Sequence, residues 1–477
     1  MASPLHLEVA GIAGENGAML ISRPVLSAFV LNGLHSATQG LAGAVFPTRH
    51  KLVSAEVEGL SMPPENLQVE LVSLTPDVAL VVKPEFSFFV RLGYAADMTK
   101  TFARFEFKVS NLSVRLSGQG ALLALTPEFQ DVEVLTDVTP AARADAIAAS
   151  GIDNDELLRV EGSFAYGTGN ALLSSALGQL RTIDLAKMFP NVAFAGKLQL
   201  ETTNDALLVI PESMILTPWS GCAPFDPTRG LSVKTQQANR SGDSFSFDVD
   251  AQHAPPTEPK VNERLPDVAV YAPKPLLDAR FGTLSPALTY VDEGSGVIGH
   301  VVRLTAAIKR ITITIQGGAL RLSLGLKLWG LGSLNIEVPC LGRQEFGRIE
   351  ADLPESGEAD ISVDLRLGVD TSARALLTSE IVGMSLGKAK VSFSLFGSAL
   401  GLVKLNIYGY ITDFIVGRII QHNLPGLVFD AIKESLDHQY AVVADLGDYL
   451  SFLKMKPNMA MYSGTDKSAL MGLNYFG

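Results

Sequence analysis

Hydrophobic and polar residues alternate with a period of two along much of the chain, which is typical of strands buried on one face. The longest such run extends from Leu320 to Leu328, where leucine occupies every second position and arginine, serine, glycine and lysine lie between. Shorter runs of the same kind lie at residues 67–71, 86–90, 105–109, 112–116, 311–315, 363–367 and 391–395. The pattern predicts a long, strongly curved antiparallel sheet in each half of the chain.

Three other stretches carry apolar residues at helical spacing. Residues 24–46 begin with Pro24 shortly after Ser22, a pairing that favours a helix start, and residues 171–180 carry an apolar stripe. Residues 411–436 are apolar almost all round, and a helix of that kind is normally buried. The predicted fold class is therefore α+β, with each curved sheet wrapped around a long apolar helix.

A polar, proline-rich stretch divides the chain near its middle. Residues 237–265 include Pro255, Pro256 and Pro259 among charged and small polar residues. Such composition is typical of a linker between domains. We expect a first module at residues 1–236, a linker at residues 237–265 and a second module at residues 266–477.

The two halves share two short motifs in the same order. RPVLSA at residues 23–28 matches KPLLDA at residues 274–279, and MFPNVA at residues 188–193 matches MKPNMA at residues 455–460. Each motif carries one proline at the same position, so chance recurrence of proline-containing turns is one explanation. The shared order, with strands between the motifs in both halves, favours an internal duplication of one module.

Composition removes some classes of partner. Acidic residues number 50 and basic residues 38, so the net charge is -12, which disfavours nucleic acid and anionic membranes as partners. Hydrophobic residues make up 47% of the chain and the mean hydropathy is +0.24. Since the most apolar stretch, residues 397–420, is interrupted by Lys404, Asp413 and Arg418, we expect no membrane span but a large apolar interior.

The two cysteines, Cys222 and Cys340, are too few for a disulfide framework or a cysteine-rich metal site, and we interpret both as small apolar residues. The N-terminal residues lack the basic and apolar regions of a secretory signal. These features predict a cytoplasmic location, with non-classical secretion as the alternative.

No sequence pattern identifies a catalytic or metal site. Ser398 lies one position too early for the nucleophile motif of serine hydrolases, and residues 167–169 lack the third glycine and the context of a dinucleotide site. Residues 153–155 start like a calcium loop but lack its glycine and its final glutamate, so an Asp-rich turn is the simpler interpretation. We expect no enzyme activity, no cofactor and no bound metal.

With the KPLLDA motif at the head of the second half, the layout resembles the tubular lipid-binding (TULIP) superfamily. Within it, the chain is most similar to the bacterial branch that includes the accessory proteins of clostridial neurotoxin gene clusters. The resemblance covers about residues 5–235 and 265–477. It implies two sheet-and-helix modules that hold lipid acyl chains in apolar grooves and, in several members, transfer the lipid between membranes.

Lipid binding is therefore the first functional hypothesis, with a fatty acid or phospholipid as the ligand and transient contact with membranes. The expected lipid-binding residues are Leu26, Phe29, Val30, Leu277, Phe281, Phe414, Ile415, Ile419 and Phe429. Closed core packing is the alternative for each of them. In a second hypothesis the grooves are filled by side chains and the protein is a scaffold for a protein partner in a larger complex; an enzyme acting on a lipid is a third.

Overall fold

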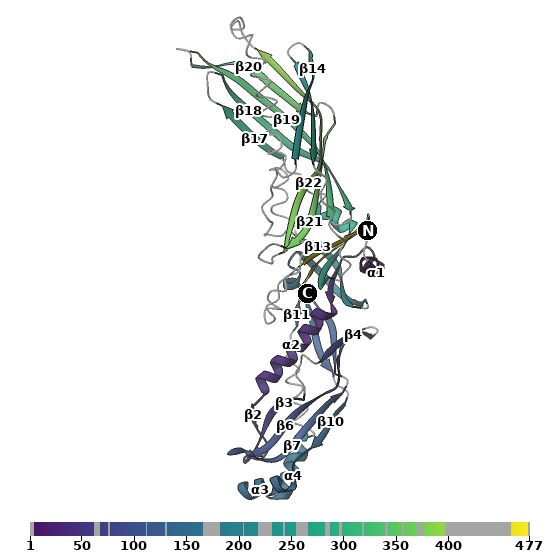
Figure 1. Cartoon of the computed structure of the whole chain (residues 1–477), viewed down its shortest axis with the longest axis vertical. Coiled ribbons are helices and arrows are strands. Elements are labelled where there is room, and N and C mark those ends of the chain that lie inside the picture. The colour runs from purple at the N-terminus through teal and green to yellow at the C-terminus, as the bar shows by residue number, and fades with distance from the viewer. Residues whose placement is uncertain are drawn as a thin grey trace.

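The computed structural model describes residues 4–475, with gaps at residues 62–66, 75–76, 111, 129–130, 166–181, 204, 218–230, 242–243, 254–265, 282–286, 295–297, 317–318, 339–341, 355–356, 370–374 and 396–458. The molecule is elongated, and its sheets follow one another along the long axis (Figure 1). Both termini lie near the middle (Figure 1). Two of the predicted helices, at residues 171–180 and 411–436, lie outside the described residues.

A six-stranded antiparallel sheet at the middle joins the two halves of the chain. Its order is β12 (Val192–Thr202), β13 (Ala206–Leu216), β1 (Ala18–Ser22), β16 (Val268–Pro273), β24 (Ser468–Asn474) and β23 (Met459–Gly464). The first three strands come from the first half and the last three from the second. The halves are connected where β1 pairs with β16, with Met19 opposite Val270.

Strands β1, β16 and β24 of this central sheet are buried on both faces. Helix α1 (Pro4–Ala13) covers one face, where Val9 packs in a cluster with Leu20 and Tyr271. His6 of the same helix is fully buried, and its Nε2 lies 2.8 Å from the Ser468 Oγ. Helix α1 is not among the helices predicted from the sequence, and its Val9 and Ala13 are buried against the sheet.

Two five-stranded sheets form the rest of the first half. One contains β10 (Asp131–Thr136), β7 (Asp97–Ser110), β6 (Phe86–Tyr94), β3 (Val53–Leu60) and β2 (Val45–Pro47) in that order. The other contains β11 (Ile183–Asp184), β9 (Leu122–Glu128), β8 (Ser113–Gln119), β5 (Asp77–Lys83) and β4 (Gln68–Leu74). The alternating runs of the first half are therefore confirmed as strands.

Helix α2 (Arg23–Leu41) contacts β1, β3 and β4. The prediction of a helix here is confirmed, but its predicted end at Phe46 is wrong. Gly43 has φ 75° and β2 begins at Val45. A left-handed glycine ends a helix at little cost, so the chain changes direction after Leu41.

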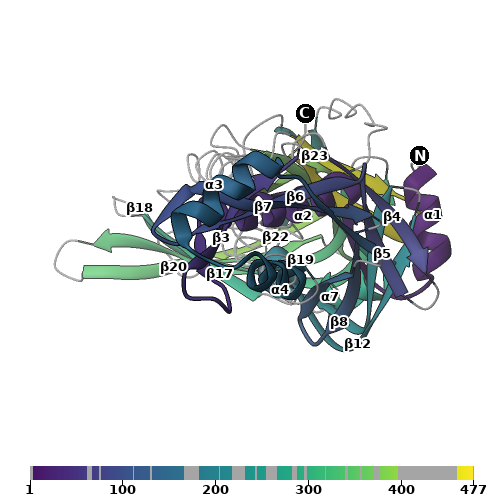
Figure 2. The ribbon, with the colours of Figure 1, turned by 90° about the horizontal axis from the view of Figure 1, so that it is seen from below.

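Two short helices, α3 (Pro140–Ser150) and α4 (Asn154–Ser163), cover the end of the first half. Viewed from that end, they lie in front of β3, β6 and β7 (Figure 2). The Asp153 side chain caps α4 by accepting a hydrogen bond of 3.1 Å from the Asp155 N–H. The sequence predicts an Asp-rich turn at residues 153–155, and the structure places these residues at the start of α4.

One large sheet forms most of the second half. Its order is β14 (Leu231–Ser241), β15 (Ser244–His253), β22 (Ala375–Leu395), β20 (Gly342–Leu353), β19 (Ala319–Val338), β18 (Ile298–Gln316) and β17 (Ala287–Gly294), while β21 (Ala359–Val369) pairs with β19 and β22. Helix α7 (Lys274–Phe281) contacts β13, β16 and β18. The leucine alternation of residues 320–328 is confirmed as part of β19.

Part of the predicted linker forms strands instead. Residues 237–241 belong to β14 and residues 244–253 to β15, and β15 pairs with β22 of the second half. The signal was present, because Phe245, Phe247 and Val249 alternate with polar residues as strand residues do. Residues 254–265 lie outside the described part, and the division into modules stays a prediction.

Among the described helices, none is long and apolar enough to cross a membrane.

A buried carboxylate connects the strands at the middle of the central sheet. Asp267 is 4% exposed, accepts a 3.2 Å hydrogen bond from the Ser22 hydroxyl, and accepts a 2.6 Å bond from the Tyr475 N–H. Asp205 forms the corresponding surface contact, a 3.2 Å ion pair with Arg23, with 46% of its side chain exposed. The first carboxylate is buried and the second is solvated.

We expect Asp267→Ala to lower the free energy of unfolding by about 1–3 kcal/mol, because a buried N–H of Tyr475 loses its acceptor. Asp205→Ala is the control and should cost about 0–1 kcal/mol, as exposed ion pairs do. Urea unfolding followed by circular dichroism measures both. Equal losses in the two variants would contradict this account of the central sheet.

Candidate functional site

The largest group of buried side chains, here called the long apolar cluster, extends through the central sheet into both halves. Each of its buried members is at most 9% exposed. Members from the first half include Leu67, Val69, Leu80, Val114, Leu116 and Leu123; members from the second half include Val302, Leu304, Leu322, Leu324 and Val363. The inner faces of sheets that lie far apart along the molecule therefore border one apolar interior.

Helix α2 presents one face to this cluster. Val25, Leu26 and Val30 are fully buried and Leu34 is 1% exposed, while Phe29 is partly buried and packs against them. Leu26, Val30 and Leu34 follow one another at intervals of four residues, so these side chains lie on one side of the helix. The apolar residues of α2 therefore face the interior, whereas Arg23 at its start is exposed to solvent.

Helix α7 contributes Leu276 and Leu277 to the same cluster from the second half of the chain. Leu277 is fully buried and Leu276 is partly buried. A Cβ atom at Gly17 would lie 2.5 Å from the Met214 Sδ and 2.7 Å from the Leu276 Cδ1. A side chain at position 17 would therefore require the flexible ends of Met214 on β13 and Leu276 on α7 to shift.

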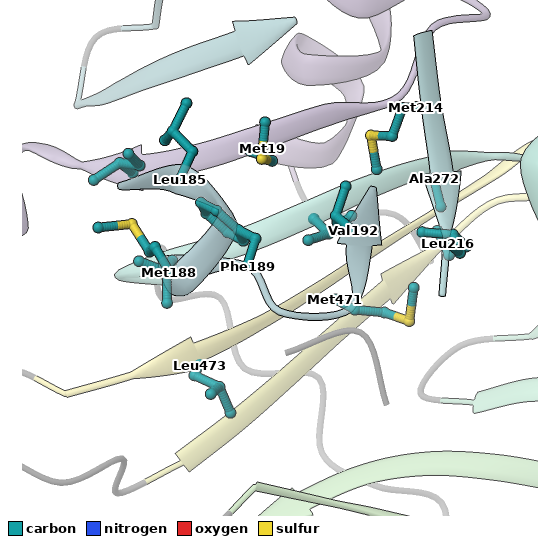
Figure 3. Close-up of a cluster of buried hydrophobic side chains, with 14 of the residues drawn as sticks. Met19, Leu185, Met188, Phe189, Val192, Met214, Leu216, Ala272, Met471 and Leu473 are labelled. Carbon is teal, nitrogen blue, oxygen red and sulfur yellow. The ribbon is translucent and has the colours of Figure 1, made fainter. Parts of the chain in front are cut away.

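Methionine side chains are prominent where the cluster meets the central sheet. Figure 3 shows Met19, Met188, Met214 and Met471 among leucine, valine and phenylalanine side chains. Methionine is flexible and polarizable, and it adapts to irregular apolar surfaces better than branched residues do. This part of the cluster can adjust its shape without exposing a polar group.

The first copy of the Met-x-Pro-Asn motif forms a turn that contributes to the interior. Met188 ends helix α6 (Leu185–Met188), and both Met188 and Phe189 are fully buried. The Phe189 N–H donates to the Leu185 carbonyl at 2.8 Å, and the Thr217 N–H donates to the Asn191 carbonyl at 2.9 Å. In the second copy, residues 455–458 lie outside the described residues.

The structure brings together part of the predicted lipid-binding set. Leu26, Val30 and Leu277 belong to the long apolar cluster, and Phe29 packs against it. Phe281 ends α7, and its side chain is outside the described ones. The remaining predicted residues, Phe414, Ile415, Ile419 and Phe429, lie outside the described residues.

The contribution of the central strands is not evident from the sequence. Met19, Met214 and Met471 lie on β1, β13 and β24, of which β1 and β24 are short and apolar. A short apolar run predicts a buried strand but does not reveal which other strands surround it. Their shared location depends on pairings between residues that are far apart in the sequence.

A second, smaller apolar cluster lies beneath α3 and α4. Phe105, Phe107 and Phe164 contact one another there, with ring centroids 5.5–6.3 Å apart. Glu161 at its edge is 8% exposed and bonds the Arg143 Nη1 at 2.6 Å. Burial raises the pKa of the Glu161 carboxyl above its ordinary value of 4.5, and the hydrogen bond from Arg143 opposes part of that rise.

No group of three or more histidine, cysteine, aspartate or glutamate residues in the described part of the chain is arranged to hold a metal ion.

No family model matches the chain, and no curated protein matches its sequence. Among solved structures the chain is similar to lipopolysaccharide binding protein, with a TM-score of 0.37 and 10% identity, over 97% of this chain and 99% of that one. It is similar also to P47 from Clostridium botulinum A2, with a TM-score of 0.28 and 10% identity, over 96% of this chain and 97% of that one.

We expect Leu26→Ala to lower the free energy of unfolding by about 2–5 kcal/mol, because the deletion leaves a cavity in the long apolar cluster. Leu31→Ala on the same helix is the control, since Leu31 is only partly buried and its loss should cost less. Denaturant unfolding measures both. A cost for Leu26→Ala no larger than that for Leu31→Ala would contradict the packing described for α2.

The raised pKa of Glu161 predicts a pH dependence of the helical end. The folded state binds this proton more tightly than the unfolded state, so the stability it contributes is lost as the pH rises from 4.5 through the folded pKa. Hydrogen exchange in α3 and α4 should therefore become faster over this pH range as stability is lost. Glu161→Gln should reduce that increase. Asp155→Asn, at an exposed position of α4, should leave the slope unchanged, and an equal effect would contradict the prediction.

Proposed function

We propose that this protein binds lipid acyl chains without catalysis, in the long apolar cluster between the curved sheets and helices α2 and α7. The single observation that carries the proposal is the continuity of this cluster across the central sheet. Leu26, Phe29 and Val30 would line it in the first half, and Leu277 in the second. The other predicted lipid-binding residues would extend this lining; they are Phe281, Phe414, Ile415, Ile419 and Phe429.

The energy of burial is sufficient for such a ligand. Each methylene removed from water contributes about 0.8 kcal/mol, so a sixteen-carbon chain gains on the order of 12 kcal/mol before its costs. Ordering of the chain and loss of its free motion remove a large share of this gain. Micromolar to nanomolar affinity follows without any charged anchor, and a fatty acid or phospholipid is the ligand class that fits.

We also propose that the two halves are copies of one module, as the shared motifs predict. Lys274 lies 251 positions after Arg23 in the matched motifs. Met19 and Val270 are separated by the same offset, and they pair with each other in the central sheet. A two-fold relation between two copies places equivalent residues opposite each other at its axis.

Equivalent turns support the same relation. The Thr203 N–H donates to the Ala206 carbonyl at 2.9 Å, and the Thr465 N–H donates to the Ser468 carbonyl at 2.9 Å. Both turns connect the last two strands of their half, and both threonines are followed three residues later by a small residue at the start of a strand. Two such modules would give the protein two ends at which a lipid can enter, which is the basis for proposing lipid transfer.

Native mass spectrometry of the purified protein, followed by organic extraction, tests the proposal. We expect a lipid adduct above the mass of 50.8 kDa, and uptake of a fluorescent fatty acid by protein from which the lipid has been removed. Phe29→Asp should abolish uptake, because a carboxylate beside the acyl chain would lose its hydration. The partly buried position of Phe29 lets the variant fold more readily than a change at Leu26 would.

Ile215→Asp is the matched control, since Ile215 is 61% exposed and lies outside the cluster. It should bind the fatty acid as the unchanged protein does. Bare protein mass together with no uptake of fatty acid or phospholipid would overturn lipid binding. That result would favour the scaffold alternative, in which side chains fill the interior and the surface binds proteins.

A further inference from the structure

The outer face of the large second-half sheet carries exposed apolar side chains on β19. At residues 329–332 this strand has large apolar residues outside and glycines inside, the opposite of its earlier residues. Trp329 is 38% exposed and Leu331 is 59% exposed, while Gly330 and Gly332 occupy the inward positions between and after them. Earlier in the same strand, leucines point inward and polar residues point outward. At residues 329–332 the large apolar residues therefore face solvent.

The reversal follows from close packing on the inner face. A Cβ at Gly332 would lie 2.8 Å from the Val302 Cγ2, and a Cβ at Gly330 would overlap the Leu304 side chain. Val302 and Leu304 of β18 thus fill the inner space that β19 leaves empty. The inner face explains the glycines but does not explain why the outward positions hold tryptophan and leucine.

The strands on either side of β19 place opposite charges beside this pair. On β18, Arg303 lies opposite Leu331, and on β20, Glu350 lies opposite Leu331 from the other side. In the next row, Trp329 has a threonine of β18 on one side and Asp352 of β20 on the other.

None of the three charged side chains in these two rows forms an ion pair or hydrogen bond with another residue in the described part of the chain. These charged residues are Arg303, Glu350 and Asp352, and all three are exposed. The surface therefore has an apolar centre, hydrogen-bond donors along one side and carboxylates along the other.

We propose that this surface, formed by Arg303, Trp329, Leu331, Glu350 and Asp352, is the interface of a homodimer. A two-fold axis parallel to β19 places β18 of one copy over β20 of the other. Arg303 then faces the Glu350 of the second copy, and the reverse contact forms at the same time. Self-complementarity of this kind is what a two-fold interface requires.

The apolar centre supplies the attraction and the charges select the partner. Trp329 and Leu331 of each copy meet their counterparts along the axis, and tryptophan and arginine are the residues that carry most binding energy in protein interfaces. Carboxylates along one side, with a net charge of -12 for the chain, oppose docking on an anionic membrane. The inference is independent of whether a lipid occupies the interior.

Analytical ultracentrifugation of the full chain over the micromolar range tests the interface. We expect a concentration-dependent species of twice 50.8 kDa. Trp329→Ser should weaken self-association by roughly tenfold or more, as loss of a central anchor does. Val291→Ser on the edge strand is the control, because Val291 is also exposed, at 44%, but lies outside the two rows beside β19.

Charge reversal gives the sharper measurement, because its pattern identifies the pairing. Arg303→Glu alone and Glu350→Arg alone should each be monomeric, since every cross-interface pair then repels. An equimolar mixture of the two variants should form a heterodimer, in which both pairs are attractive again. The double variant R303E/E350R should dimerise like the unchanged protein.

A monomeric protein throughout the micromolar range would overturn the proposal. So would a dimer that Trp329→Ser and the single charge reversals leave unchanged, because the interface would then lie elsewhere. Flotation of monomeric protein with phosphatidylcholine vesicles, lost in Trp329→Ser, would also overturn it and assign this surface to membranes.

Discussion

The antiparallel pairing of β1 with β16 is the constraint on which the rest of the structure depends. These two strands are five and six residues long, yet they connect the two halves of the chain in one sheet. Both are buried on both faces, so every side chain along them has a packing partner. Strands of this length would not be stable alone, and their stability comes from the layers above and below.

The central sheet determines where each helix begins. Helix α2 starts directly after β1, and α7 starts directly after β16, so both helices leave the sheet from equivalent positions. Their apolar faces then extend the interior in opposite halves, which makes the long apolar cluster continuous. The buried members of this cluster are hydrophobic side chains, and at its centre they include methionines, which adapt easily to their neighbours.

The two proposals use different parts of the same sheets. Inner faces would bind hydrocarbon, because the sheets curve around apolar side chains, and one outer face would bind a second copy. Gly330 and Gly332 of β19 bear on both proposals. They let side chains of β18 fill the interior, and the large residues of β19 lie on the outer face. A strand in the period-two pattern can serve both faces in this way, because successive side chains point in opposite directions.

The sequence alone determined the type of the main elements. The leucine alternation at residues 320–328 identifies a strand and the apolar face of residues 24–41 identifies a helix, since both signals arise from neighbours along the chain. Only the tertiary structure decided that β15 pairs with β22, that α1 covers the central sheet, and that Met19 and Met471 belong to one cluster. These contacts join residues separated by more than a hundred positions, and their energy comes from packing that no local pattern records.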